Sequence, residues 1–410
     1  IATTRRQRQV AVSSEHEMAE TVKLITRIGP NVNEIARRTG IHKESVRYRY
    51  KSFILRGGRR IHAIIDREAL GLRQIVVRTR FGMPYKSHAH KILAEIYRCC
   101  YLAGYDKELV GDRYIMIFDV PAEHIAHFKE VLLNLEEIGI LEGVRIFDCG
   151  YWKLARTKVE LYDFKRDEWK FDWTSPRTLD STTQPRPTKS KVDDIDLLLL
   201  KELKKDADRS LTEIGKAIAE VEHIRINSRT LDYHYNRHVK RQRLVNGYAI
   251  GWPNTHSTDS HRKANPMLME VMVVVGGLSR EESTKIQALT KPLPFLWGEA
   301  LGEDYYGKFV FPVEIVNDAM AYLGKMLNDF GDRGSIFLGD QSKSVSSFPF
   351  HELIDPAEKT WRFDKGNVLS LFQVVALELK DERLVLNPSP SPSSTDLWPR
   401  EPAFRPLTHV

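Results

Sequence analysis

The sequence predicts an α+β protein in which two winged helix-turn-helix domains are each followed by a ferredoxin-like βαββαβ domain. Two observations carry this prediction. The same order of helix and strand patterns occurs twice, about 185 residues apart, and the excess positive charge is concentrated in one helical segment. A chain of 410 residues is also longer than a typical single domain, so several compact units are expected.

The first helix-turn-helix starts with a helical spacing of apolar residues over 15–29, which Gly29-Pro30 ends. Asn31 and Glu34 have the spacing of a capping box and start a second helix. A third helix extends from about Lys43 to about Leu55, and the segment after it alternates as a wing strand does. Residues 15–66 are therefore predicted to form the first winged helix-turn-helix domain.

The second helix-turn-helix is predicted over residues 192–252. An acidic segment starts its first helix, and Ser210 with Glu213 repeats the capping box. Thr230–Tyr235 matches Ser45–Tyr50 residue class by residue class, which identifies a second recognition helix. A six-residue insertion precedes that helix, and Asp232 stands where the first copy has Arg47. Because an aspartate repels phosphate, we expect the second copy to bind DNA differently from the first, weakly or not at all.

Each helix-turn-helix is followed by a strand, a helix, two strands, a helix and a final strand. This order is the split-βαβ pattern of a ferredoxin-like domain, which we expect over residues 70–165 and 266–345. A Ser/Thr/Pro-rich linker, 170–191, lies between the halves. The C-terminal extension, 351–410, contains a Pro/Ser run and is expected to be partly disordered.

The distribution of charge favours a nucleic-acid partner. Residues 31–62 contain nine Lys or Arg and two Glu, a net charge of +7 that equals the excess of the whole chain. Concentrated positive charge is typical of proteins that bind a polyanion. The alternative is a basic helix face that is only solvated.

In the third helix Val46, Tyr50 and Phe53 share the inward face, so the remaining positions are expected to face the major groove. Arg47 is expected to contact guanine, and the other basic side chains to contact phosphate. The predicted DNA-binding residues are Lys43, Ser45, Arg47, Tyr48, Arg49, Lys51, Arg59 and Arg60 in the first module, and Arg229, Tyr233, His234 and Arg237 in the second. The alternative for Tyr48 is packing against a neighbouring helix.

A helix-turn-helix opened by Asp193-Asp-Ile-Asp196, followed by a βαββαβ module with a Gly-acid-x-Tyr turn, resembles the Lrp/AsnC (feast/famine) transcriptional regulators. The resemblance covers about 320 residues as two tandem copies. It implies sequence-specific binding of double-stranded DNA. It also implies self-association through the ferredoxin-like domains, as an intrachain pseudo-dimer or a homodimer.

The resemblance further implies that a small-molecule effector binds at the turns formed by Gly111, Asp112, Gly302, Glu303 and Asp304. Gly-Asp is equally ordinary turn chemistry, so a purely structural role is the alternative for both turns.

Two other functions remain open from the sequence. Siroheme decarboxylases, which are haem-pathway enzymes, share this architecture, and a non-specific chromatin or partition protein would have the same basic segment. No P-loop, GxSxG, HExxH or strand-linked GxGxxG motif is present, so we expect no enzymatic activity, no catalytic residues and no cofactor.

We also expect no metal site, because His88, His90, Cys99 and Cys100 lack ligand spacing and are better explained by packing. Three cysteines in an odd count, together with no long apolar run and no secretory signal pattern, favour a cytoplasmic protein without a membrane partner.

Overall fold

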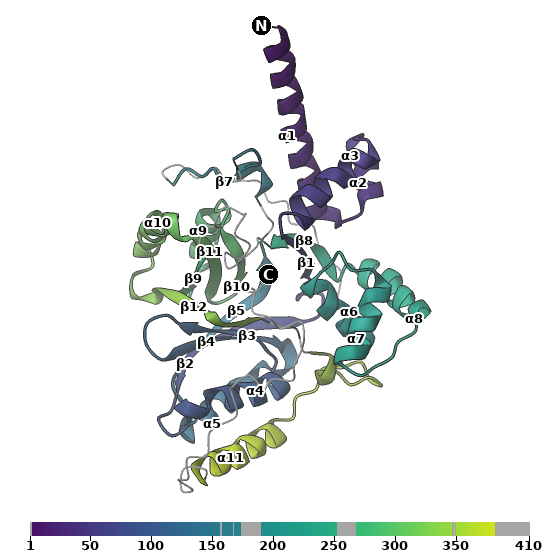
Figure 1. Ribbon diagram of the computed structural model, residues 1–410. Helices are drawn as coiled ribbons and strands as arrows, with labels where there is room; N and C mark the ends of the chain where they lie inside the picture. The colour runs from purple at the N-terminus through teal and green to yellow at the C-terminus, as the bar shows by residue number, and fades with distance from the viewer. Residues whose placement is uncertain are drawn as a thin grey trace, which may run out of the picture.

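The computed structural model describes residues 2–155, 158–166, 168–173, 190–251, 268–346, 348 and 350–381, and it confirms the predicted fold class (Figure 1). Two helix-turn-helix units lie beside a barrel that the two ferredoxin-like modules build together. Most of the predicted linker lies outside the described residues. Within the described part of the chain, no helix combines the length and the apolar character needed to cross a bilayer.

The two helix-turn-helix units have the same element order. The first consists of α1 (Ala2–Ile28), α2 (Val32–Thr39), α3 (Lys43–Tyr50), the π-helical turn η1 (Lys51–Leu55) and β1 (Arg60–Ile65). The second consists of α6 (Asp194–Lys205), α7 (Leu211–Val221), α8 (Ser228–Tyr233), the π-helical turn η5 (His234–Lys240) and β8 (Val245–Gly251). Gly40 ends α2 with a φ of 71°, a left-handed conformation that glycine adopts without strain.

The two wing strands pair with each other. β1 and β8 form an antiparallel ribbon in which Arg60 lies opposite Gly251 and Ile65 opposite Val245. The backbone groups on the facing edges of the two strands are paired in this way, and the ribbon joins the two helix-turn-helix units to one another.

Each ferredoxin-like module has the predicted βαββαβ order. The first consists of β2 (Leu72–Phe81), α4 (Ala89–Cys99), β3 (Leu102–Glu108), β4 (Arg113–Pro121), α5 (Ile125–Glu137) and β5 (Leu141–Leu154). The second consists of β9 (Leu268–Val275), α9 (Arg280–Thr290), β10 (Leu296–Leu301), β11 (Tyr305–Pro312), α10 (Val316–Asn328) and β12 (Gly334–Ser346). The sheet orders, β3-β4-β2-β5 and β10-β11-β9-β12, place corresponding strands at corresponding positions.

The two sheets close into one eight-stranded barrel. β5 pairs with β10, and β12 pairs with β3, so that each module's last strand joins the other module's second strand. The closed barrel leaves no exposed sheet edge. Its interior buries an apolar cluster that includes Val76 and Ile115 from the first module and Met272, Val274 and Tyr306 from the second. The pairing expected between ferredoxin-like modules therefore occurs within this chain.

The C-terminal extension contains ordered structure that the sequence left unassigned. The short helix η8 (Phe350–Leu353) leads to α11 (Lys365–Asp381), which packs against α5. The indole of Trp361 donates to the Leu70 carbonyl over 3.1 Å, and Lys365 pairs with Glu130 at 2.5 Å. The extension therefore covers the first ferredoxin-like module, while residues 382–410 lie outside the described part. A short hairpin, β6 (Tyr162–Asp163) with β7 (Glu168–Trp169), follows β5.

Candidate nucleic-acid interface

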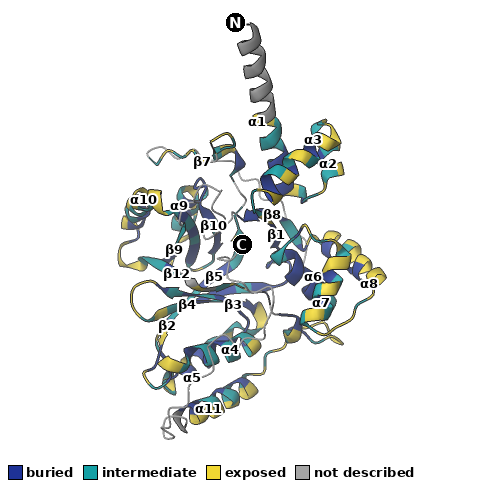
Figure 2. Ribbon diagram, viewed as in Figure 1, coloured by how far each residue is buried: buried dark blue, intermediate teal, exposed yellow. Residues whose placement is uncertain are grey.

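Packing of the first helix-turn-helix fixes which face of α3 is free. Val46 is fully buried, and Tyr50 and Phe53 are also in the core. Figure 2 shows the resulting contrast within α3, which has both buried and exposed positions. The predicted inward and outward faces of this recognition helix are therefore the observed ones.

Five predicted contact residues lie on or beside the outer face. Lys43 and Lys51 are exposed, and Ser45 and Arg47 are half-buried. Arg47 pairs with Glu44 at 2.5 Å on the surface, an interaction worth little in water that a phosphate or a base edge can replace. The Tyr48 side chain is 65% exposed, so it does not pack on a neighbouring helix.

Two predicted contact residues are turned inward. Arg49 forms an ion pair with Glu17 of α1 and is mostly buried. The guanidinium of Arg59 lies 4.1 Å from the Phe53 ring centroid and donates to the Phe53 carbonyl and, over 3.2 Å, to the Tyr162 hydroxyl. These side chains hold the unit together. Arg60 is exposed, but it starts a strand that pairs with β8 instead of a free wing.

The charged side chains of α2 pair with one another. Glu34 accepts hydrogen bonds from Arg37 and Arg38, and these contacts hold the pKa of Glu34 at about 2. Asn31 caps the helix by accepting from the Glu34 backbone N–H. The Glu34 side chain thus binds the two arginines and does not complete the predicted capping box. Because one glutamate faces two arginines, α2 keeps a net positive charge.

The second recognition helix presents a different surface. Arg229 and Arg237 are exposed, and Tyr233 is 55% exposed. His234 is 8% exposed and lies against Asp196, so its prediction as a DNA contact is corrected: the buried carboxylates of α6 hold its ring inside the unit. Asp232 is on the exposed face, as the sequence indicated.

The two predicted effector turns differ in their surroundings. Gly111 has a φ of 98° in open space, and Asp112 forms a surface ion pair with Lys86 at 3.0 Å. Asp304 instead accepts from the Asp148 backbone N–H at 2.6 Å and from the Gly277 N–H at 2.8 Å. The second turn is therefore hydrogen-bonded to β5 through the Asp304 carboxylate.

A buried ionic triad inside the barrel was not predicted from the sequence. Lys308 of β11 lies 2.8 Å from Asp106 of β3 and 3.0 Å from Glu270 of β9. Burial lowers the pKa of Lys308, but Asp106 and Glu270 more than offset this and raise it above its ordinary value. Because Asp106 belongs to the first module, the triad links the two modules across the barrel.

A second polar group lies where α6 and β1 meet the barrel, with Arg67 and Asp119 buried and His62 and Lys204 half-buried. Burial, followed by repulsion from Arg67, lowers the pKa of Lys204 to about 7. The Lys204 carbonyl lies 2.9 Å from His62 Nδ1, and Arg67 pairs with Asp119 at 3.1 Å. His62 Nε2 and Asp119 Oδ1 are buried and have no hydrogen-bond partner in the described structure. Buried polar atoms of this kind call for a ligand or water.

Comparison with known proteins gives similar folds only. No protein-family model and no curated protein matches the sequence. The siroheme decarboxylase NirDL has a TM-score of 0.45 at 9% sequence identity, covering 88% of this chain and 99% of NirDL. NirDL in complex with an iron-uroporphyrin III analogue has a TM-score of 0.46 at 9% identity, covering 82% and 96%. An anthrone oxidase-like protein has a TM-score of 0.31 at 8% identity, covering 69% and 94%.

At such identities the similarity concerns the fold alone. The expectation that this chain has no enzymatic activity is corrected to this extent: an enzyme, NirDL, is among the similar structures, so the architecture does not exclude catalysis.

Proposed function

We propose that the chain binds double-stranded DNA through the outer face of α3. The observation that carries this proposal is the exposure of Tyr48 on α3 and of Lys51 at the start of η1, both turned away from the buried Val46, with Lys43 exposed at the first residue of α3. A recognition helix that buries one side and presents cations and an amphipathic ring on the other suits the major groove. More specifically, we propose that the chain regulates transcription in the manner of the Lrp/AsnC proteins.

The ribbon between the two units supports a fixed geometry for binding. β1 and β8 pair over their whole length, so the helix-turn-helix units are joined by backbone hydrogen bonds as well as by the chain. Both units lie on the same side of the barrel (Figure 1). The second unit presents Asp232 beside its two arginines, so we assign it the smaller share of the affinity.

The test is fluorescence anisotropy with labelled genomic duplexes across a salt series. We expect binding tighter than about 10 μM at low salt and a steep decrease as salt rises, because phosphate contacts release counterions. The variant Lys43→Ala/Lys51→Ala should reduce the slope of log K against log salt by about 2, since each phosphate contact contributes about 0.9.

The matched control is Lys285→Ala/Lys325→Ala, which removes the same charge from exposed positions of α9 and α10. We expect this control to bind like the parent chain. Equal loss of affinity in both double variants would show that net charge alone, and not the face of α3, is responsible. Absence of binding by the parent chain would refute the proposal.

The second candidate is a haem-pathway enzyme of siroheme decarboxylase type. The observation that favours it is the polar group around Lys204, whose side chain is half-buried, donates to the Ser346 hydroxyl over 3.3 Å and has a pKa lowered to about 7. Lys204 interacts electrostatically with His62 and Asp119, each of which has a buried atom without a hydrogen-bond partner in the described residues. A carboxylate-rich tetrapyrrole would find a cation and a hydrogen-bonding ring there. The test is incubation with siroheme: a shifted absorption band that Lys204→Met abolishes supports this candidate, and an unchanged spectrum of free siroheme contradicts it.

A further inference from the structure

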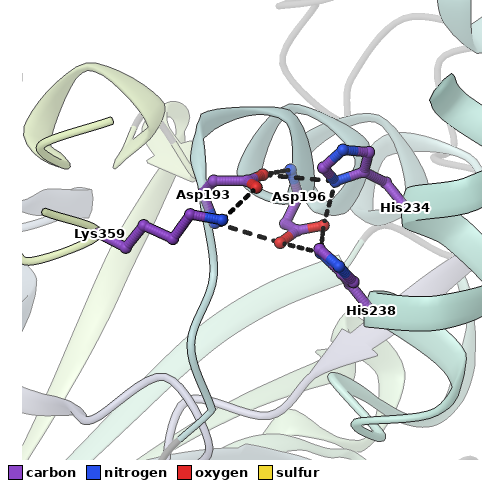
Figure 3. A network of polar contacts seen from close by, with 5 residues as sticks. All are labelled: Asp193, Asp196, His234, His238 and Lys359. Carbon is purple, nitrogen blue, oxygen red and sulfur yellow. Dashed lines mark hydrogen bonds and ion pairs between the residues drawn. The ribbon is translucent and has the colours of Figure 1, made fainter. Parts of the chain in front are cut away.

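Four potential metal ligands converge where α6 meets η5 in the second helix-turn-helix unit (Figure 3). Asp193 caps α6, and its Oδ1 accepts from the Asp196 backbone N–H, while Asp196 Oδ2 accepts from the Asp193 N–H. This reciprocal capping box turns both carboxylates toward η5. His234 and His238 are four residues apart on that helical segment, so both rings face the carboxylates.

The donor atoms are close enough to share one ion. His234 Nδ1 lies 2.9 Å from Asp196 Oδ1 and 3.4 Å from Asp193 Oδ1, and His238 Nδ1 lies 2.9 Å from Asp196 Oδ2. One ligand atom from each of the four side chains falls within 4.8 Å of the others. A tetrahedral zinc ion with bonds of about 2.1 Å separates its ligands by roughly 3.4 Å, so small side-chain shifts suffice.

We propose that Asp193, Asp196, His234 and His238 form a binding site for a divalent transition-metal ion of the zinc class. Two imidazole nitrogens and two carboxylate oxygens are an N/O ligand set that suits Zn²⁺ or Co²⁺. On binding, the metal replaces the imidazole–carboxylate contacts, and each Nδ1 that carries a proton releases it. The sequence spacing did not suggest this site, because the two pairs are 38 residues apart.

The first helix-turn-helix unit shows what such an ion would do. Glu17 in the first unit and Asp196 in the second occupy equivalent positions, each 14 residues before the residue that caps the unit's second helix. Arg49 and His234 are also equivalent, because they lie three residues after the buried Val46 and Leu231, respectively. In the first unit the permanent charge of Arg49 binds Glu17 and ties the recognition helix to the first helix. In the second unit two carboxylates, one of them fully buried, face two imidazoles at the corresponding place. A metal ion there would supply the cation that Arg49 supplies in the first unit.

Lys359 places one positive charge at the edge of this cluster. Its Nζ lies 3.2 Å from Asp193 Oδ2, whereas His234 lies next to the other carboxylate oxygen, Oδ1. The residue has a φ of 55°, a left-handed conformation held by a 2.7 Å hydrogen bond from its N–H to the Asp355 carbonyl. Since an ammonium group beside a metal ion repels it, Lys359 is expected to weaken the binding of the ion and to link its occupancy to the C-terminal extension.

The experiment is a titration of the full chain with Co²⁺, followed by competition with Zn²⁺. The parent chain should show the visible d–d bands of tetrahedral Co²⁺ with one tight equivalent. Asp193→Asn keeps the helix cap, because asparagine caps as well as aspartate does, but it should lower the Co²⁺ affinity at least tenfold. Lys359→Met should raise the affinity severalfold, a result that a purely structural His–Asp network would not produce.

The control is His351→Ala, because Glu222, His351 and Glu352 form another group with ligand atoms close together. This variant should keep the tetrahedral bands, whereas His234→Ala/His238→Ala should lose them, with circular dichroism verifying the fold of each variant. Absence of the bands in the parent chain, or an unchanged Co²⁺ affinity in both Asp193→Asn and the double histidine variant, would overturn the proposal. No DNA is present in the titration, so its outcome is independent of the proposed function.

Discussion

Removing the charge of Lys308 should destabilise the barrel strongly. The Lys308→Met variant keeps the length of the side chain but leaves Asp106, which is 1% exposed, and Glu270, which is 11% exposed, without their cation. Breaking a buried ion pair by removing one partner costs about 3–5 kcal/mol. We expect a loss in the free energy of unfolding at pH 7 near the upper part of that range, because two carboxylates lose a partner.

The pH dependence adds a signature. The pKa of Lys308 is raised in the folded chain, so its contribution is fully present below the ordinary lysine pKa and is lost only as pH rises through the raised value. The parent chain should therefore show no change from this group between about pH 5 and 9. In the variant the facing carboxylates repel one another until one is protonated, so the stability deficit should shrink as the solution is acidified.

Denaturant unfolding followed by tryptophan fluorescence and circular dichroism measures the effect. The triple variant Lys308→Met/Asp106→Leu/Glu270→Leu should recover much of the loss, because apolar residues often replace a buried ionic group without cost. Lys285→Met, at an exposed ion pair with Asp329, is the control and should change stability by less than about 1 kcal/mol. A cost below about 1 kcal/mol for Lys308→Met, with no added pH dependence, would refute the reasoning.

Three further changes have definite expected results. Gly302→Ala should cost about 1–3 kcal/mol in a denaturant melt, because its Cβ would lie 2.7 Å from the Gly150 nitrogen and 2.8 Å from the Asp148 carbonyl oxygen. Burial would raise the pKa of Glu222, but His351 and Lys201 lower it to about 2. The stabilisation from Glu222 is therefore present above about pH 4.5 and is lost as pH falls toward 2. Glu222→Gln should flatten the dependence of Tm on pH in that window. Burial raises the pKa of the Cys149 thiol well above its ordinary value, so iodoacetamide should label Cys149 only after denaturation, as mass spectrometry can verify.

The local patterns predicted much of the fold. The predicted pair Ser210–Glu213 forms a complete capping box, and the buried positions Val46, Tyr50 and Phe53 follow the helical period. These features depend on neighbours a few residues away, which is why the sequence carries them. Even so, the second half of β12, which extends to Ser346, pairs with β3 more than 200 residues earlier in the chain, and no local pattern indicates that pairing.

The site was harder to predict for the same reason. The outward face of α3 follows from periodicity, but the inward turn of Arg49 depends on Glu17, which lies 32 residues away, and the burial of His234 depends on Asp196. No periodicity signals the pairing of the two wing strands or of Asp106 with Lys308, since each joins elements from opposite halves of the chain. Only the tertiary structure shows which polar groups become partners.

The most direct test of the central claim is photo-crosslinking from position 48 to a labelled duplex. A photoreactive phenylalanine analogue at Tyr48 replaces an exposed aromatic ring on the proposed contact face, and the same analogue at Val110, which is 80% exposed on the β3–β4 turn, is the control. We predict a crosslink from position 48 that disappears at high salt and none from position 110. Equal labelling from both positions, or none from position 48 under conditions where the duplex is bound, would contradict DNA binding by α3.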